Sequence, residues 1–397
     1  MSSGGASAGL GGSSPSVNGA GGNQAGGGQS AATAGGGSSG GGGAEIGGGW
    51  GELGGDSAGG GSAAAAGEGG AADTLTDFDG RCGQGWAAGG AAPAPHLEGS
   101  VTPQVDSTGN WSFSFGRYRF VVAGAAGARV IEFSIDTVNL LDPTGGSTFW
   151  PSPQQAWTWP PAAEIDTAAY TAQSDATSVT LSSAISTTLG LSVQKRFSVN
   201  ANSGVVSIEY RLKNESQASA SWAPWEITRV RAGGYTFAPK GPGNRTITED
   251  SNFAALPLSL LPPPPAENGI EWLNYPSISA SLTKSDYIVE FDGAEGWLAH
   301  ADKLGKNSLP VLFVKSFVDA PDASLPTNQA EIQLWTSGTA NPKLIEVEEQ
   351  GAQQVLAAGA SLSWTVHWSA CQLPSTLTLA AGSAELASLA RAHAVKP

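Results

Sequence analysis

Two groups of charged residues are candidates for proton transfer. Glu346 and Glu348 lie two residues apart in the segment Leu344–Gln350, so an extended chain places both on one face. Two carboxyls so close would raise the pKa of at least one of them if they faced a cleft. Glu226 and Arg229 lie three residues apart at the end of another strand-like segment, which places them on opposite faces. A charged strand face is more often simply solvated, so the pattern leaves open whether these residues take part in catalysis or only contact solvent.

Histidine is scarce, with four in the chain, and one of them suggests chemistry. His300 lies at the end of a strand-like segment among polar neighbours that include Lys303. His367 lies in an alternating segment, where a half-exposed structural role is the better interpretation. The chain has no HExxH or P-loop motif and no CxxC pair, and outside the Gly/Ser-rich first part it has no GxSxG nucleophile elbow. We therefore expect neither a metal site nor a cofactor.

Aromatic residues are gathered in proline-rich segments. The stretch Phe149–Pro161 contains Trp157, Trp159 and Gln154. The C–H face of a sugar ring stacks on an indole, while its hydroxyls need a few fixed polar partners. The stretch supplies both kinds of group, which predicts carbohydrate as the partner, although packing of a loop onto the domain would need the same tryptophans. Further polar candidates for this binding site are Arg229, Lys303 and Glu346.

The first part of the chain differs in composition from the rest. Most of the 56 glycines lie before Gly90, with alanine and serine between them. Such a stretch cannot bury enough apolar surface to offset the cost of ordering, roughly 1–2 kcal/mol per backbone residue. We expect residues 1–90 to be a disordered Gly/Ser/Ala-rich linker and residues 91–397 to form one domain. The GxGxxG-like spacings in the linker have no strand before them, so no nucleotide site is expected.

The remaining chain is divided into short segments rich in β-branched and aromatic residues, separated by turn residues. This pattern is typical of an all-β protein, and we predict a large β-sandwich of antiparallel sheets. One helix is expected at Ala384–Ala394, with Ser383 as its N-cap, and loops are expected at Pro151–Pro161 and Pro262–Pro265. The predicted strands are Trp111–Val122, Ala128–Leu141, Ser178–Leu181, Leu189–Val199, Val205–Leu212, Trp222–Arg231, Ser277–Leu282, Tyr287–Phe291, Trp297–His300, Pro310–Phe317, Glu331–Thr336, Leu344–Glu349 and Ser361–Ser369.

The order of these segments from about Gly99 to Leu373 resembles the galactose mutarotase-like (aldose 1-epimerase-like) superfamily. Each motif is weak alone, and the order and spacing together carry the resemblance. It implies a β-supersandwich and a sugar substrate. The segments that carry it are Gly127–Val130, Leu191–Phe197, Val206–Ser216, Val347–Gln350, Val355–Ala360 and Leu362–Trp368.

The resemblance implies that Glu348 is the general base, but the chain departs from the family at the acid. Where a mutarotase has His-Pro-Tyr-Phe, this chain has Ala223-Pro-Trp-Glu226, so the catalytic histidine of that motif is missing. Epimerisation removes a proton from the anomeric hydroxyl and delivers one to the ring oxygen. Glu226, His300 or Lys303 are the candidates for the acid. The alternatives are a non-catalytic glycan-binding module on a surface tether, or a structural surface domain without a small ligand.

The acidic balance bears on partners and location. A formal net charge of −15 repels phosphate backbones, so nucleic acid is not expected, and no run of about eighteen apolar residues predicts a transmembrane helix. A long tether suits a domain held away from a surface, so we expect a secreted protein or a surface-tethered lipoprotein with its export segment upstream. A disulfide between Cys82 and Cys371 would fit an oxidising compartment, and two unpaired thiols are the alternative.

Overall fold

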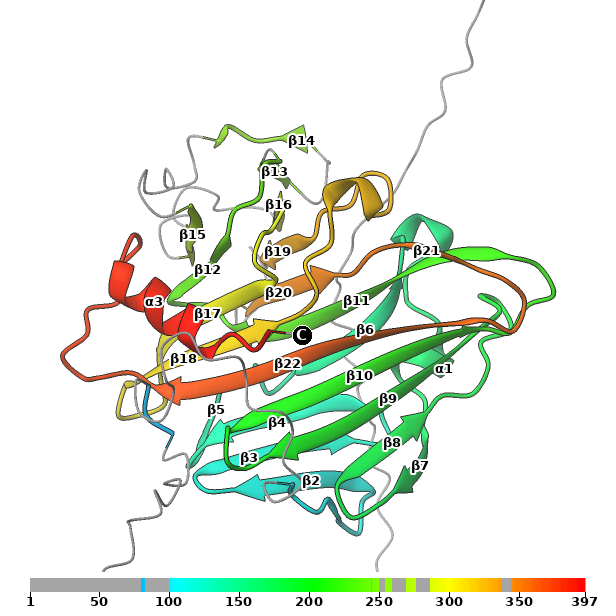
Figure 1. The fold of residues 1–397 in the computed structure, drawn as a ribbon, viewed down its shortest axis with the longest axis horizontal. Coiled ribbons are helices and arrows are strands. Elements are labelled where there is room, and N and C mark those ends of the chain that lie inside the picture. Colours follow the sequence, from blue (N-terminus) through cyan, green and yellow to red (C-terminus); the bar gives the residue numbers. More distant parts are fainter. Residues whose placement is uncertain are drawn as a thin grey trace, which may run out of the picture. The chain divides into compact units, whose positions relative to one another are not determined.

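The computed structural model describes residues 80–82, 100–243, 245–249, 254–258, 269–275, 286–336 and 344–396. These residues form two large antiparallel sheets that lie face to face (Figure 1). The all-β sandwich expected from the strand-like segments is confirmed. No helix among the described residues has the length and apolar character needed to cross a membrane.

The larger sheet contains the strands that position the candidate site. Its central strands are long and buried, as expected where both faces are covered. In spatial order its strands are β1 (Gln104–Val105), β2 (Asn110–Phe115), β3 (Tyr118–Ala123), β4 (Arg129–Ile135), β6 (Ser147–Ser152), β11 (Ala220–Arg231), β20 (Leu344–Gln350), β19 (Ile332–Thr336), β16 (Tyr287–Phe291), β13 (Thr246–Glu249) and β14 (Ala254–Ala255), with β5 (Val138–Asn139) beside β4 and β21 (Gln354–Leu356) beside β11.

The smaller sheet covers the inner face of the larger one. Its strand order is β15 (Ile270–Asn274), β12 (Tyr235–Pro239), β17 (Trp297–Leu304), β18 (Leu309–Ser316), β22 (Ser361–Gln372), β10 (Val205–Asn214), β9 (Leu191–Asn200), β8 (Ser178–Ser182) and β7 (Thr171–Ser174).

Aromatic side chains from both sheets meet in the core between them. Phe120 and Phe133 of the larger sheet both lie 6.0 Å, between ring centroids, from Trp368 of the smaller one. Phe120 also contacts Phe197, and Phe133 contacts Phe313. All five rings are buried. Such tilted and edge-on pairs add about 0.5–1.5 kcal/mol each beyond the burial of their area.

The differences from the predicted strands have local causes. The run Trp111–Val122 forms two strands, because the chain reverses at Gly116, whose φ is +53°, a conformation that glycine adopts at no steric cost. Strand β6 continues to Ser152, so the loop expected from Pro151 begins two residues later than predicted. The predicted strand Ser277–Leu282 and the predicted loop Pro262–Pro265 lie outside the described residues.

The predicted C-terminal helix is present as α3 (Ala384–His393). The Oγ of Ser383 accepts a hydrogen bond from the backbone N–H of Leu386 at 3.2 Å, as an N-cap does. Leu386 and Ala390 lie buried on one face of the helix. The other short helices among the described residues are η2 (Gln154–Ala156), α1 (Ala163–Asp166) and η4 (Asp322–Ser324).

The cysteines pair, which decides between the two alternatives left by the sequence. A disulfide joins Cys82 to Cys371 at the end of β22. The backbone N–H of Cys82 donates to the carbonyl of Gln372, whose own N–H donates to the carbonyl of Gly80. Residues 80–82, within the segment expected to be linker, are therefore held against the sandwich.

Candidate functional site

Strand register gathers the tryptophans and acids on the outer face of the larger sheet. Trp150 pairs with Trp225 across β6 and β11, and Glu346 pairs with Trp335 across β20 and β19. Glu348 lies two residues from Glu346 and therefore shares its face. The residues between them, such as Val347, point into the core instead. The five side chains thus converge from four adjacent strands.

These side chains surround a small cavity, which we call the Trp–Glu cavity. Its volume is about 20 Å³, which is room for about one water molecule. Two more residues reach it from beyond the end of β6, where the chain turns back over the sheet. The cavity is lined by Trp150, Gln154, Trp159, Trp225, Ile288, Trp335, Glu346 and Glu348.

Hydrogen bonds fix the indoles that line this cavity. The Nε1–H of Trp150 donates to Asp166 Oδ1 at 2.8 Å, and that of Trp225 donates to Glu348 Oε2 at 2.8 Å. The two rings meet edge to face with their centroids 5.4 Å apart, and Trp159 contacts Trp150 at 5.5 Å in the same way. The aromatic walls are therefore held in place before any ligand binds.

The two acids in the cavity have different electrostatic surroundings. Glu346 Oε1 forms an ion pair with the guanidinium of Arg229 at 2.7 Å, and this guanidinium also lies over the ring of Trp150. Glu348 is buried, and no cation of the described residues forms an ion pair with it. Burial, with the charge of Glu346, raises its pKa well above the ordinary value. The N–H of Trp225 and the charge of Arg229 oppose this shift without cancelling it. The protonated form of Glu348 is therefore favoured more than that of an exposed glutamate.

Trp157 lies beside the cavity rather than in its lining. Its Nε1–H donates to the carbonyl of Pro151 at 2.8 Å, and its ring meets Trp150 edge-on at 6.1 Å. Trp157 thus holds the turn after β6 against the sheet. Of the two tryptophans predicted to bind sugar, only Trp159 faces the cavity.

Glu226 lies on the opposite face of β11, in the core between the sheets. Its strand partner is Glu349, and both carboxyls reach the ammonium of Lys315, at 2.9 Å and 2.6 Å. Tyr210 and Trp368 also donate hydrogen bonds to Glu226. Burial raises the pKa of Glu349 well above its ordinary value. Because Glu226 faces the core and Glu348 faces outward, the two carboxyls lie on opposite faces of the larger sheet.

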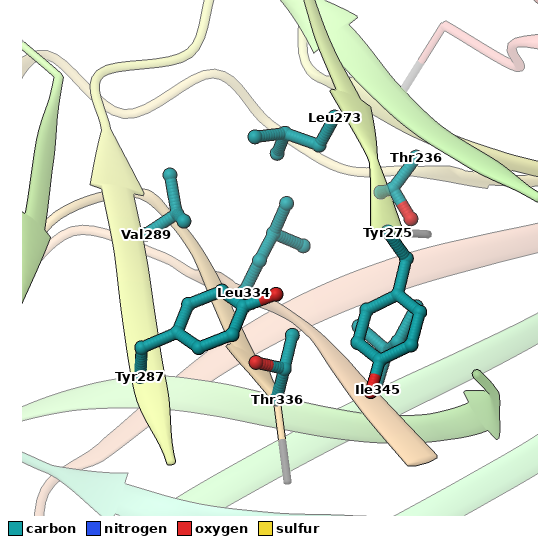
Figure 2. A pocket seen from close by; sticks show the side chains of 8 residues that line it. All are labelled: Thr236, Leu273, Tyr275, Tyr287, Val289, Leu334, Thr336 and Ile345. Carbon is teal, nitrogen blue, oxygen red and sulfur yellow. The ribbon is translucent and has the colours of Figure 1, made fainter. Parts of the chain in front are cut away.

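His300 also faces the core. Its Nδ1 lies 2.9 Å from the hydroxyl of Thr236, and burial lowers its pKa to about 4, so the ring is neutral. Thr236 lines a second small cavity of about 20 Å³ between the sheets, where the hydroxyl-bearing rings of Tyr275 and Tyr287 stand close to Thr336 (Figure 2). The structure does not bring His300 to the Trp–Glu cavity.

Lys303 lies in a third place, an open groove of about 1010 Å³. The groove is formed by the β4–β5 turn, the end of β11 and the β17–β18 hairpin, which contribute Asn139, Arg231 and Lys306. Lys303 itself is exposed. The structure thus brings Glu346, Glu348, Gln154 and Trp159 together, with Arg229 adjoining them, and places Lys303 elsewhere.

Sequence reasoning did not select Trp150, Trp225 and Trp335 as cavity residues. Trp225 and Arg229 lie four residues apart on one strand, so alternation places their side chains on the same face. This pattern was a signal that Trp225 lies on the face of the acids. No strand was predicted around Trp150, because the prolines that follow it hide the end of β6. For Trp335, only knowledge of the β19–β20 pairing would have placed it beside Glu346.

Several solved structures resemble this chain. A galactose mutarotase-like protein from Lactobacillus casei is 12% identical, with a TM-score of 0.46 over 66% of this chain and 100% of that one. A galactose mutarotase related enzyme from Lactobacillus acidophilus is 9% identical, with a TM-score of 0.45 over 68% and 100%. A galactose mutarotase-like protein from Clostridium acetobutylicum is 10% identical, with a TM-score of 0.43 over 69% and 99%.

These neighbours carry the name of the superfamily that the order of segments resembles. No curated protein matches the sequence. A family model described as "Domain of unknown function (DUF4380)" matches residues 151–371, which include every residue that lines the Trp–Glu cavity except Trp150. The match spans more than half of the 397 residues, and the chain belongs to this family.

Proposed function

We propose that the Trp–Glu cavity binds a sugar at its anomeric end and catalyses proton transfer there, as an aldose 1-epimerase does. The observation that supports this most directly is the buried Glu348, held by Trp225 beside the ion-paired Glu346 and with its pKa raised above the ordinary value. Two neighbouring acids with different electrostatic surroundings are the arrangement expected of an acid–base site. The tryptophans would stack on the C–H faces of the ring.

The state of Glu348 changes the role suggested by the family resemblance. A buried carboxyl that keeps its proton near neutral pH is suited to donate it, so we assign Glu348 as the general acid that protonates the ring oxygen. Trp225 orients the carboxyl through Oε2. Gln154, which comes from the turn after β6, is assigned to the sugar hydroxyls.

A second candidate is a glycan-binding module without catalysis. The size of the cavity favours it, since a volume of about 20 Å³ accommodates about one water and not a sugar ring. Under this alternative, a sugar would contact only the half-buried Trp159 and its surroundings at the rim. Under the catalytic proposal, the turn that carries Gln154 and Trp159 must move away from the sheet when sugar enters.

NMR exchange spectroscopy on a panel of free aldoses separates these functions. With the full chain present, exchange cross-peaks between the α and β anomers should grow, and Glu348→Gln should abolish the acceleration. Sugar lines that broaden without faster exchange would favour the binding module. A panel that shows neither effect would reject both.

A control variant tests whether the effect is specific to the cavity. Glu209→Gln changes a half-buried glutamate on β10 of the other sheet and should leave anomer exchange unchanged. A loss of activity in both variants would mean that the substitutions act through the fold.

We also propose that the protein works outside the cytoplasm, secreted or held at a surface by its N-terminal segment. The disulfide between Cys82 and Cys371 supports this, because such bonds persist in oxidising compartments. Fractionation of the native cells tests the proposal. Recovery of the protein with reduced thiols in the cytosol would contradict it.

A further inference from the structure

The proposed reaction needs a second proton-transfer group, and the residues suggested for it by the sequence lie elsewhere. Glu226 and His300 face the core, and Lys303 lies in the separate groove. Glu346 shares the cavity, but its carboxylate is engaged by Arg229. The second group must therefore lie near Glu348 on the outer face of the larger sheet.

One row of cross-strand partners leads from Glu348 to a further acid. Glu348 of β20 pairs with Gln333 of β19, and Gln333 pairs with Glu290 of β16. Directly paired residues in antiparallel strands point to the same face, so all three side chains project outward. Adjacent strands lie about 4.8 Å apart, which separates the backbones of Glu348 and Glu290 by about 10 Å. Two glutamate side chains can reach one small ligand across that span.

Gln333, between the two acids, has an unsatisfied acceptor. Its side chain is fully buried and its Nε2 donates to the carbonyl of Ala330 at 3.3 Å, but its Oε1 has no hydrogen-bond partner among the described residues. A buried acceptor without a donor costs about 1–3 kcal/mol. A ligand hydroxyl placed over this row would satisfy it, and sugar hydroxyls are such donors.

We propose that the site extends across β19, with Glu290 as the second proton-transfer group and Gln333 as the acceptor that positions a sugar hydroxyl between Glu290 and Glu348. This inference rests on the proposed function. It assigns a base to the reaction. Because the sequence lacks the histidine motif, the acid–base pair was otherwise incomplete.

The reaction written with these groups balances. The Glu290 carboxylate takes the proton of the C1 hydroxyl while the Glu348 carboxyl gives its proton to the ring oxygen. The bond between C1 and the ring oxygen breaks with its electron pair on that oxygen, and C1 becomes an aldehyde carbon. Rotation about the C1–C2 bond and the reverse transfers close the ring as the other anomer, with both glutamates returned to their starting states.

Charges around Glu290 agree with this division of roles. Burial raises the pKa of Glu290 to about 7, opposed by a hydrogen bond from Thr246 on β13, so its carboxylate form is available to take a proton as pH rises above 7. Besides Glu346, Glu348 and Arg229, the described residues place two more titratable groups near Glu290: Asp292, on the same strand, and Glu331, which directly precedes β19. Burial also raises the pKa of Asp292 and Glu331. No cation is paired with Glu290 among the described residues, so the base is not neutralised.

The test compares anomer exchange by the full chain and its variants at several pH values. Glu290→Gln should slow exchange by about 10²-fold at pH 8 and remove the rise in rate that the unchanged protein shows as pH passes through 7. Glu290→Asp should keep that rise at an intermediate rate. Gln333→Leu should weaken sugar binding and slow exchange while keeping the pH profile.

The outcomes separate this inference from the proposed function. An active protein whose rate and pH profile are unchanged in both Glu290 variants would overturn the role of Glu290 and leave the proposed function standing. An unchanged protein that fails to exchange any aldose would overturn both. Thermal unfolding of each variant, with Glu209→Gln as the matched control, shows whether the fold is kept; if Glu290→Gln does not fold, the rate and pH profile of Glu290→Asp decide.

Discussion

At the scale of single residues, the candidate site depends on hydrogen bonds that fix large side chains. Trp225 is held by Glu348 and Trp150 by Asp166, so both rings keep one orientation. Trp159, from the turn after β6, is less buried than either and is the more accessible of the three to a ligand. The neighbouring Trp157 has a different role, because its N–H is used by the carbonyl of Pro151.

This difference predicts different effects for two adjacent tryptophans. Trp159→Ala should weaken sugar binding by about 1–3 kcal/mol, as for an aromatic anchor, with little effect on unfolding. Trp157→Ala should instead lower the free energy of unfolding and reduce affinity less. Titration calorimetry and urea unfolding on both variants measure the two quantities. Equal losses of affinity in both variants would contradict the assignment of the cavity lining.

Lys315 is a single buried residue on which the charge balance of two neighbouring carboxyls depends. Its ammonium is buried and contacts Glu226, Glu349 and the hydroxyl of Thr228. Without it, two carboxyls would remain buried in the core with no cation. Lys315→Met should therefore lower the free energy of unfolding by about 3–5 kcal/mol, measured by urea unfolding.

The exposed Lys303 supplies the control for this prediction. Lys303→Met should change the free energy of unfolding by less than about 0.5 kcal/mol, because a solvated side chain away from the core contributes little. A similar small change in Lys315→Met would show that the buried carboxyls of Glu226 and Glu349 do not depend on the lysine.

At the scale of elements, β16, β19 and β20 place several acids on one buried surface. Their pKa values are raised by burial, to about 7 for Glu290 and about 8 for Glu331, and the charges of Asp292 and Asp319 add to the shift at Glu331. The only cation that forms an ion pair on these three strands' outer face, among the described residues, is Arg229, which reaches Glu346 from β11. Ionisation of these acids therefore opposes folding.

This arrangement predicts a fall in stability as pH rises. A carboxyl whose pKa is higher in the folded protein contributes stability below its unfolded pKa, near 4.5, and this contribution is lost as pH rises toward the folded value. For Glu331 the loss is roughly 1.4 kcal/mol per pH unit within this window. The free energy of unfolding in urea should be lower at pH 8 than at pH 5, and the fall should be smaller in Glu331→Gln. An identical fall in the variant would assign the effect to general repulsion in a chain of net charge −15.

Alternation along single strands could be read from the sequence, and it placed Glu346 and Glu348 on one face and separated Glu226 from Arg229. It could not show which strands are neighbours. The β16–β19 pairing joins Phe291 at the end of one strand to Ile332 at the start of the other, about forty residues later, so Glu290 gave no local signal. His300 and Lys303 were selected for chemical type, and their faces depended on pairing with β12 and on the end of a hairpin.

At the scale of the whole molecule, the described residues form one sandwich whose outer face carries the candidate site. The disulfide joins its N-terminal edge, at Cys82, to Cys371 at the end of β22, closing a loop with a sequence separation of 289 residues. A cross-link over so long a loop lowers the conformational entropy of the unfolded chain. The bond also fixes where the N-terminal segment leaves the domain.

Loss of this bond should destabilise the domain without altering the candidate site. Cys82→Ser should lower the free energy of unfolding by about 2–5 kcal/mol, measured in urea under non-reducing conditions, and a reductant should lower that of the unchanged protein to the same value. The reductant should have no further effect on Cys82→Ser. Sugar binding should survive in the folded variant, because none of the residues that line the Trp–Glu cavity contacts either cysteine through a hydrogen bond or ion pair among the described residues. A chain equally stable with and without the bond would mean that the backbone pairing of Gly80–Cys82 with Gln372 is enough to hold this edge without the disulfide.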